Sequence, residues 1–452
     1  MSILKLKKIM ANKVRFNENY PEITESEKLI NRADKLIPAF SQTLAKGPTQ
    51  WVKGVAPNYL VRGKGSRVWD ADGNEFIDYN MGIGPLILGY CNDRVDNAIK
   101  AQLEDGITFS MMHPLEVIVA EKLNSIIPNA ESVRFSKTGA EVTTAAVRLA
   151  RAYTKRDKVL CCGYHGWHDW YISVTDRNSG IPGNSRDLTY TFNYNDIDSL
   201  KDALDEDVAC VILEPMIFEM PEPGFLESVQ ELCKANGSLL IFDEMWTGFR
   251  MALGGAQQYF GITPDLAVYS KAVANGMPIS LLTGKEEYMN LLDKEVFFFS
   301  TFGGEALSLA AALETMNIIE EENVPDAIFK KGKLLKDGYN KIAESLDMPF
   351  TKCTGYDART IITFNSEYGS SLEMKSLVQQ EMIKLGILWG GFHNLCYAHT
   401  GDDIQYTLRA YDTVLPILKK AIEEKNISNY LKGKPVEPVF RKTTNFKQAE
   451  KV

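Results

Sequence analysis

Short, wholly apolar runs alternate with helix-like stretches through the middle of this chain, from about residue 115 to 310. Such short runs, bounded by turn residues, are typical of strands that are buried on both faces. Strands that alternate with helices form a mostly parallel sheet wrapped by those helices. We therefore predict an α/β fold. The expected strands are Val133–Phe135, Val159–Cys162, Val208–Leu213, Leu239–Asp243 and Leu266–Ser270.

Three of these runs lead into a residue that can do chemistry. The runs end at Glu214, at Asp243 and at Lys271. The carboxyl ends of parallel strands face one crevice, where ligands of open α/β sheets bind. A lysine beside an acid can hold an aldehyde cofactor as a Schiff base. The pattern therefore predicts two carboxylates and a lysine lining one site.

Each of the three has an alternative interpretation. A buried carboxylate at Asp243 needs a cationic partner, which is either the protonated pyridine nitrogen of a cofactor or an arginine. Glu214, which precedes Pro215, either lines the crevice or caps a loop. Lys271 follows an apolar strand, and its alternative is an ordinary exposed lysine.

A candidate phosphate site precedes the helical run of residues 142–153. Ser136, Thr138, Gly139 and Ala140 lie where free N–H groups gather at a helix N-terminus, which attracts anions. An ordinary Ser/Thr cap is the alternative. The segment Ser300–Gly304 offers the same two interpretations before another Ala-rich helix.

An aromatic loop, Gly163–Trp170, follows the expected strand 159–162 and contains Tyr164 and His165. Such a loop is suited to stacking on a flat ligand, with core packing as the alternative. The acid, the lysine, the anion site and this loop all fall at strand-to-helix junctions of one sheet. Their convergence predicts a phosphorylated aromatic aldehyde, pyridoxal 5'-phosphate (PLP).

At this point the sequence resembles a known family. Phe242–Arg250, Pro264–Leu266 and Tyr269–Lys271 resemble the class-III PLP-dependent aminotransferases, nearest to the branch containing glutamate-1-semialdehyde 2,1-aminomutase. Further matching segments follow in order between about residues 55 and 310. They are Val68–Tyr79, Val147–Tyr153, Tyr164–Gly166, Leu213–Pro215 and Ser300–Gly304. The general plan extends to about residue 425.

The resemblance implies a fold-type-I transferase that acts as a homodimer with its active site at the subunit interface. It implies that Lys271 forms the internal aldimine and that Asp243 pairs with the pyridine nitrogen. Tyr164 would stack on one face of the ring and Met245 would pack on the other, where a valine is usual. Glu214 would line the site near the ring.

The same resemblance places the phosphate at Gly139 and its neighbours Ser136, Thr138 and Ala140, and it assigns Thr301 to the partner subunit's phosphate. The aromatic loop contributes Tyr164 and His165 as cofactor contacts. Ala140 stands where the family usually carries a hydroxyl. Bulky residues at 167, 168 and 170, and a loosely matching segment at 389–399, are further departures.

The implied function is amino-group transfer from an amino donor to an aldehyde or ketone, sugar-derived ones included, through pyridoxamine phosphate. An aminomutase that exchanges the amino group within one substrate is the alternative. A dehydrogenase-like protein would need a GxGxxG turn, and Gly82-x-Gly84 lacks the rest of that fingerprint. A non-catalytic α/β binding protein is the remote alternative, disfavoured by Lys271 and Asp243.

Composition excludes several classes of partner. The 452 residues carry a net charge of -9 without a long basic block, so we expect no nucleic-acid partner. No apolar stretch approaches the roughly 20 residues that a membrane span needs. The seven cysteines form no CxxC pair, and the basic start at residues 1–8 lacks a secretory signal, which together predict a cytoplasmic protein. The five histidines show no metal-binding spacing, so we expect no metal.

The chain ends predict a second, α+β domain. Residues 59–78 read as a small antiparallel sheet with a hairpin turn at Asp72-Gly73. We expect residues 1–80 and 321–432 to form the small domain, residues 81–320 the large PLP-binding domain, and residues 433–452 a surface tail.

Overall fold

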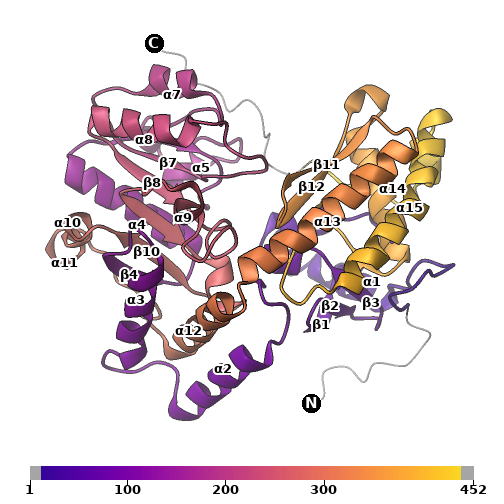
Figure 1. Ribbon diagram of the computed structural model, residues 1–452, viewed down its shortest axis with the longest axis horizontal. Coiled ribbons are helices and arrows are strands. Elements are labelled where there is room, and N and C mark those ends of the chain that lie inside the picture. The colour runs from indigo at the N-terminus through magenta and orange to yellow at the C-terminus, as the bar shows by residue number, and fades with distance from the viewer. Residues whose placement is uncertain (1–11, 439–452) are drawn as a thin grey trace. The chain divides into compact units, whose positions relative to one another are not determined.

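The computed structural model describes residues 12–438 (Figure 1). The basic stretch 1–8 and the part of the expected tail beyond residue 438 lie outside the described residues. The chain divides into two compact units. Of the described residues, one unit contains 12–92 and 327–438, and the other contains Asp93–Asp326. These boundaries fall 12 and 6 residues after the expected ones at 80 and 320 (92 − 80 and 326 − 320).

A seven-stranded sheet forms the centre of the unit Asp93–Asp326, in the order β4-β10-β9-β8-β7-β5-β6. Only β10 runs antiparallel to its neighbours, so six strands point the same way. The predicted α/β class with a mostly parallel sheet is confirmed. The strands are β4 Ser132–Ser136, β5 Lys158–Cys162, β6 Thr189–Thr191, β7 Val208–Leu213, β8 Leu239–Asp243, β9 Leu266–Tyr269 and β10 Ser280–Gly284.

Two of these strands were not predicted from the sequence. β6 has only three residues, and β10 has only two adjacent apolar residues, Leu281 and Leu282, between polar ones and a glycine. Four of the five predicted strands, β5, β7, β8 and β9, are longer apolar runs because they lie inside the sheet, whereas the predicted β4 lies at its edge. Every residue of β7 and β8 is buried, which removes the apolar–polar alternation of a half-exposed strand.

Helices surround this sheet (Figure 1). They are α2 Asp93–Asp105, α3 Pro114–Ile126, α4 Gly139–Thr154, α5 Asp169–Ile172, α6 Gly183–Arg186, α7 Ile197–Ala203, α8 Phe225–Asn236, α9 Ala256–Phe260, α10 Glu286–Met289, α11 Leu291–Lys294 and α12 Ala306–Glu321. The main core lies between α4 and one sheet face. Alternate strand residues such as Ile212, Ile241 and Val268 share this core with Ala146 and Leu149 of α4. The packing of α4 against the sheet fixes where the N-terminus of this helix lies.

The other unit contains two small sheets. β1 Leu60–Lys64, β2 Arg67–Asp70 and β3 Glu75–Asp78 pair antiparallel, as the hairpin signal predicts. However, β13 Ile387–Leu388 pairs with β3 in parallel, so the prediction of a purely antiparallel sheet was wrong. A pairing across about 300 residues leaves no local signal. The second sheet contains β11 Thr351–Tyr356, β12 Arg359–Phe364 and β14 Phe392–Asn394.

The α-helices of this unit are α1 Thr24–Ala33 near the N-terminus and three longer helices in the C-terminal part. These three are α13 Val324–Ser345, which begins just before the boundary, α14 Ser371–Lys384 and α15 Gly401–Glu423. α14 packs against α15 and β13. Within residues 12–438, no helix combines the length and the apolar character that a membrane span would require.

Candidate active site

The predicted site residues lie at one edge of the large sheet. β9, β8, β7 and β5 are consecutive parallel strands, and their carboxyl ends lead directly into Lys271, Glu214 and the loop that begins at Gly163. Asp243 is the last residue of β8. β4 points the same way and leads into the start of α4. The topology therefore places all five segments where open α/β sheets bind their ligands.

Asp243 is paired with a histidine. The Nδ1 atom of His165 lies 2.7 Å from Oδ2 of Asp243, and both side chains are almost fully buried. An ionised carboxylate only accepts hydrogen bonds, so Nδ1 must carry the proton. The other oxygen, Oδ1, accepts the N–H of Met245 at 3.0 Å. The alternative of an arginine partner for Asp243 is not what the structure shows.

The second ring nitrogen of His165 is an exception to normal hydrogen bonding. Its Nε2 atom is buried and has no hydrogen-bond partner within the described part of the chain. The backbone of the same residue is fixed, because its carbonyl oxygen accepts the hydroxyl of Thr143 at 2.8 Å. The ring of His165 is thus held by Asp243, and its main chain is held by Thr143.

Glu214 has a role in fixing the aromatic loop. Its Oε1 atom accepts the N–H of Tyr164 at 2.8 Å. Gly163 has a φ of +110°, and a Cβ atom there would lie 2.8 Å from the same oxygen, so only glycine permits this approach. Tyr164 is 37% exposed, and its ring packs edge-on against Tyr171. The loop-capping interpretation of Glu214 is the one that these contacts support.

The start of α4 is capped by Glu141. Its Oε2 atom accepts the hydroxyl of Ser136 at 2.8 Å and the amides of Lys137 and Thr138 at 3.0 and 2.8 Å. Burial alone raises the pKa of Glu141, but these hydrogen bonds outweigh it and hold the pKa below its usual value. The Ser136 hydroxyl, expected at the phosphate, is therefore used by the cap.

The amides that follow the cap remain directed out of the helix end. Gly139 and Ala140 are the first two residues of α4, and N–H groups at these positions have no acceptor within the helix. A Cβ atom at Gly139 would lie 2.8 Å from the sulfur of Met245. Glycine thus lets Met245, two residues after Asp243, approach the helix N-terminus.

Lys271 begins a short 3-10 turn, Lys271–Ala274, which is separated from the end of β9 by Ser270 alone. Its φ is +46°, in the left-handed region that non-glycine residues rarely adopt. Such backbone conformations are concentrated at functional sites. The preceding Ser270 donates its hydroxyl to the carbonyl of Ile279 at 2.7 Å, which anchors the turn to the chain before β10.

Thr301 lies in the exposed turn that precedes α12. It does not take part in the cluster formed by Asp243, His165 and Met245 in this chain. Among the predicted residues, the structure therefore brings together the Asp243 cluster and the start of α4, and it leaves Thr301 on the surface.

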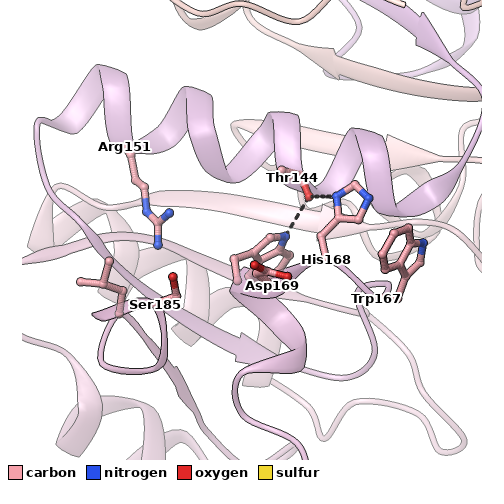
Figure 2. A pocket seen from close by; sticks show the side chains of 8 residues that line it. Thr144, Arg151, Trp167, His168, Asp169 and Ser185 are labelled. Carbon is pink, nitrogen blue, oxygen red and sulfur yellow. Dashed lines mark hydrogen bonds between the residues drawn. The ribbon is translucent and has the colours of Figure 1, made fainter. Parts of the chain in front are cut away.

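A pocket of about 460 Å³ runs along α4 beside the aromatic loop. Figure 2 shows Thr144 hydrogen-bonded to His168, with Arg151 and Ser185 at the other end. The Thr144 hydroxyl donates to the carbonyl of Ala140, so it accepts from Nδ1 of His168 at 2.8 Å and from Nε1 of Trp170 at 3.0 Å. These bonds fasten the aromatic loop to α4.

Two functional residues were missed in the sequence. Glu141 completes a Thr-x-x-Glu capping box with Thr138, a motif that could have been recognised. Glu244 follows Asp243, is fully buried and accepts the amides of Ala256 and Gln257 at 2.8 and 2.9 Å. Burial raises the pKa of Glu244 to about 7. These contacts of Glu244 require the chain to reverse direction before Ala256, and no local sequence pattern predicts that reversal.

Among residues 12–438, no group of three or more His, Cys, Asp and Glu side chains could hold a metal ion. The seven cysteines, all within the described range, are unpaired, and only Cys91 is exposed.

The sequence matches a family model described as "Aminotransferase class-III" over residues 51–395. It is 37% identical to 3-aminobutyryl-CoA aminotransferase of Cloacimonas acidaminovorans, covering 89% of this chain and 99% of the relative. It is 35% identical to glutamate-1-semialdehyde 2,1-aminomutase 2 of Geobacillus kaustophilus, covering 81% and 92%. A solved structure, the PLP internal aldimine form of FumI from Sphingopyxis sp. MTA144, superposes with a TM-score of 0.83 at 29% identity, covering 91% and 99%.

Proposed function

Because this chain belongs to the class-III aminotransferases, PLP-dependent enzymes of amino-group transfer, we propose that Lys271 and Asp243 are its catalytic residues. The family, the fold and the cofactor expected from the sequence are confirmed. The roles of individual residues, the substrate and the assembly are proposals. The observation that carries the assignment of residues is the pairing of buried Asp243 with His165 at the strand edge that also carries Lys271.

The residues present fit PLP. The buried carboxylate of Asp243 suits a protonated pyridine nitrogen, and the start of α4 offers the amides of Gly139 and Ala140 to a phosphate. Met245 and Tyr164 would pack on the two faces of the ring. Glu214 supports Tyr164 from behind through its amide. Thr138, the cap residue of α4, remains in the proposed phosphate site, whereas Ser136 would act only through Glu141.

Lys271, Asp243 and His165 would each have a separate role in the reaction. Bound PLP supplies an aldehyde for the amino group and a ring that accepts electrons. The amine of Lys271 would hold the cofactor and, once freed, would carry the proton that leaves the substrate carbon to the carbon of the cofactor that bore the aldehyde. Asp243 would hold the protonated ring nitrogen of the cofactor, and His165 would orient the Asp243 carboxylate through their hydrogen bond.

Replacement of the lysine tests this assignment. Lys271→Ala should abolish turnover, because no amine remains to hold the cofactor or to move the proton. The visible absorption band of lysine-bound PLP should also disappear. Lys285→Ala, at an exposed lysine of the same unit, is the control and should keep both. Retained turnover in Lys271→Ala would contradict the proposal.

For the substrate, we propose an aminotransferase that exchanges the amino group between separate donor and acceptor. Its oxo substrate would carry the carbonyl on the carbon β to an acyl thioester. The support is the 37% identity to a 3-aminobutyryl-CoA aminotransferase, matched over 99% of that relative. An aminomutase is the second candidate, supported by relatives at 35% identity.

The two candidates differ in their need for a second substrate. The enzyme should convert 3-aminobutyryl-CoA only when a 2-oxo acid is added, with a cycle between the PLP and pyridoxamine phosphate spectra. Turnover of glutamate-1-semialdehyde without any added donor or acceptor would instead establish the aminomutase.

We also propose a homodimer in which Thr301 of each subunit reaches the partner's phosphate. The exposed position of Thr301 supports this, as do exposed apolar side chains on the same unit, among them Met111, Met112, Val117 and Phe302. An apolar surface of this kind marks a protein interface. A cytoplasmic location is proposed as well, supported by the seven unpaired cysteines.

A further inference from the structure

Lys137 lies between two carboxylates that cap two different helices. Its main-chain N–H donates to Glu141, the cap of α4, at 3.0 Å. Its side-chain Nζ donates to Oε1 of Glu305 at 2.6 Å. Glu305 is itself the N-cap of α12 and accepts the amides of Leu307 and Ser308 at 2.8 and 3.1 Å. One residue thus joins the starts of α4 and α12.

The ion pair between Lys137 and Glu305 is largely removed from water. The side chains are 16% and 9% exposed, and Nζ also donates to the hydroxyl of Ser308 at 3.2 Å. Burial alone raises the pKa of Glu305, but the hydrogen bonds from Lys137 and Ser308, together with the charge of Lys137, outweigh it and lower the pKa. A buried pair is favourable only when such hydrogen bonds are complete, so loss of either partner is costly.

The two segments that Lys137 joins are those proposed to bind the cofactor phosphate. Gly139 and Ala140 follow it directly on α4, and Thr301 lies four residues before Glu305. The turn between them is close-packed, because a Cβ atom at Gly303 would lie 2.8 Å from the carbonyl oxygen of Phe135 at the end of β4. The distance between the start of α4 and the turn that carries Thr301 is therefore set by short contacts, namely the Lys137–Glu305 ion pair and the approach of Gly303 to Phe135.

We propose that Lys137 is a positioning residue for phosphate binding. It fixes the amides of its own subunit's site and the turn that offers Thr301 to the partner's site. This inference rests on the proposed function, in which these groups bind the phosphate of PLP. A single lysine therefore influences both sites of the dimer, although its ammonium is bound to Glu305 and Ser308.

The test compares PLP with pyridoxal, which has the same ring and aldehyde but no phosphate. In Lys137→Met, the dissociation constant of PLP should rise about tenfold or more, as expected for losing a hydrogen bond to a charged group. The constant for pyridoxal should change less than about twofold, because ring contacts are untouched. Lys137→Arg should restore most of the PLP affinity.

Two further variants complete the experiment. Glu305→Gln keeps a cap acceptor for α12 but removes the charge, so it should reproduce the phosphate-selective loss. Lys158→Met breaks a pair of equal length, Lys158 with Asp205 at 2.6 Å, which touches neither cap, and it should leave both constants unchanged.

The outcomes separate this inference from the proposed function. Equal weakening of PLP and pyridoxal, or no weakening in Lys137→Met, overturns the positioning role. If Lys137→Met fails to fold, the result for Glu305→Gln decides, and an unselective effect overturns the proposal. A wild-type enzyme that lacks the band of lysine-bound PLP would overturn the proposed function itself.

Discussion

At the scale of single residues, His165 supplies a hydrogen-bond partner to the buried carboxylate of Asp243. The imidazole donates one hydrogen bond and the amide of Met245 donates another, at 2.7 and 3.0 Å. Buried charges persist when they are hydrogen-bonded in this way. His165 is therefore a positioning residue that acts through Asp243.

Removal of this imidazole should lower the rate of the chemical step. We expect kcat of His165→Leu to fall on the order of tenfold to a hundredfold, since a hydrogen bond to a charged group is worth roughly 1.5–3 kcal/mol. KM should change little, because His165 is buried beneath the site. The absorption maximum of bound PLP should shift as its ring nitrogen is less well paired. Steady-state kinetics and spectra measure both effects.

His168→Asn is the matched control. His168 belongs to the same loop, but its ring is bonded to Thr144 on α4 instead of Asp243. This variant should therefore keep the kcat and the spectrum of the wild type. An unchanged kcat in His165→Leu would contradict the positioning role.

At the scale of elements, α4 supports the site in two ways. Its N-terminus offers amides to the phosphate, and one turn further along, Thr144 anchors the aromatic loop (Figure 2). The packing of α4 against the sheet places both features in register with the strand ends. The loop that carries Tyr164 and His165 is thus held at both its ends, by Glu214 and by Thr144.

Thr144→Val should destabilise this element. Valine is close in shape, but it leaves Nε1 of buried Trp170 and Nδ1 of His168 without their acceptor. The expected cost is about 1–3 kcal/mol in the free energy of unfolding. Chemical denaturation followed by tryptophan fluorescence measures it. Thr154→Val is the control, since the Thr154 hydroxyl only returns to the carbonyl of Ala150 in its own helix. Equal effects of the two changes would refute the anchoring role.

At the scale of the whole molecule, buried histidines should make stability sensitive to acid. His393 is fully buried, and its ring is bonded to Thr360 and Tyr411 at 2.8 and 2.7 Å. Burial, reinforced by the charge of His399, lowers the pKa of His393 from 6.5 to about 3. In the unfolded chain, His393 therefore binds a proton once the pH falls below 6.5. In the folded chain, it binds that proton only near pH 3.

The contribution of neutral His393 to the free energy of unfolding is fully present above pH 6.5 and is lost as the pH falls toward the folded pKa. Between pH 7 and 5 the loss amounts to about 2 kcal/mol, at roughly 1.4 kcal/mol per pH unit below 6.5. Buried carboxylates such as Asp70, whose pKa burial raises to about 6, act in the opposite direction. The effect of His393 is therefore measured as a difference between two proteins.

His393→Asn should be less stable than the wild type at pH 7, and the gap should narrow by about that amount at pH 5. The narrowing arises because the variant has no proton-binding group at this position. Urea denaturation at the two pH values checks it. A gap of constant size would show that His393 does not titrate on unfolding.

The sequence by itself determined the architecture of the site. Apolar runs ending in Glu214, Asp243 and Lys271 predicted buried parallel strands, and these necessarily end at one sheet edge. Burial and periodicity are local properties, so they can be read from neighbouring residues. Asp243 and Lys271, together with the candidate anion site and the aromatic loop, predicted the cofactor, and the family resemblance then indicated the class of enzyme. The capping box from Thr138 to Glu141 was equally local and was available to the same reasoning.

Only the tertiary structure decided which side chains and which strands pair with each other. It paired Asp243 with His165, 78 positions away, rather than with an arginine. It also joined Lys137 to Glu305, 168 positions away, and added β13 to β3. Such contacts depend on which surfaces the packing of helices and strands brings together. Because no short window of sequence contains both partners, they became visible only in the folded chain.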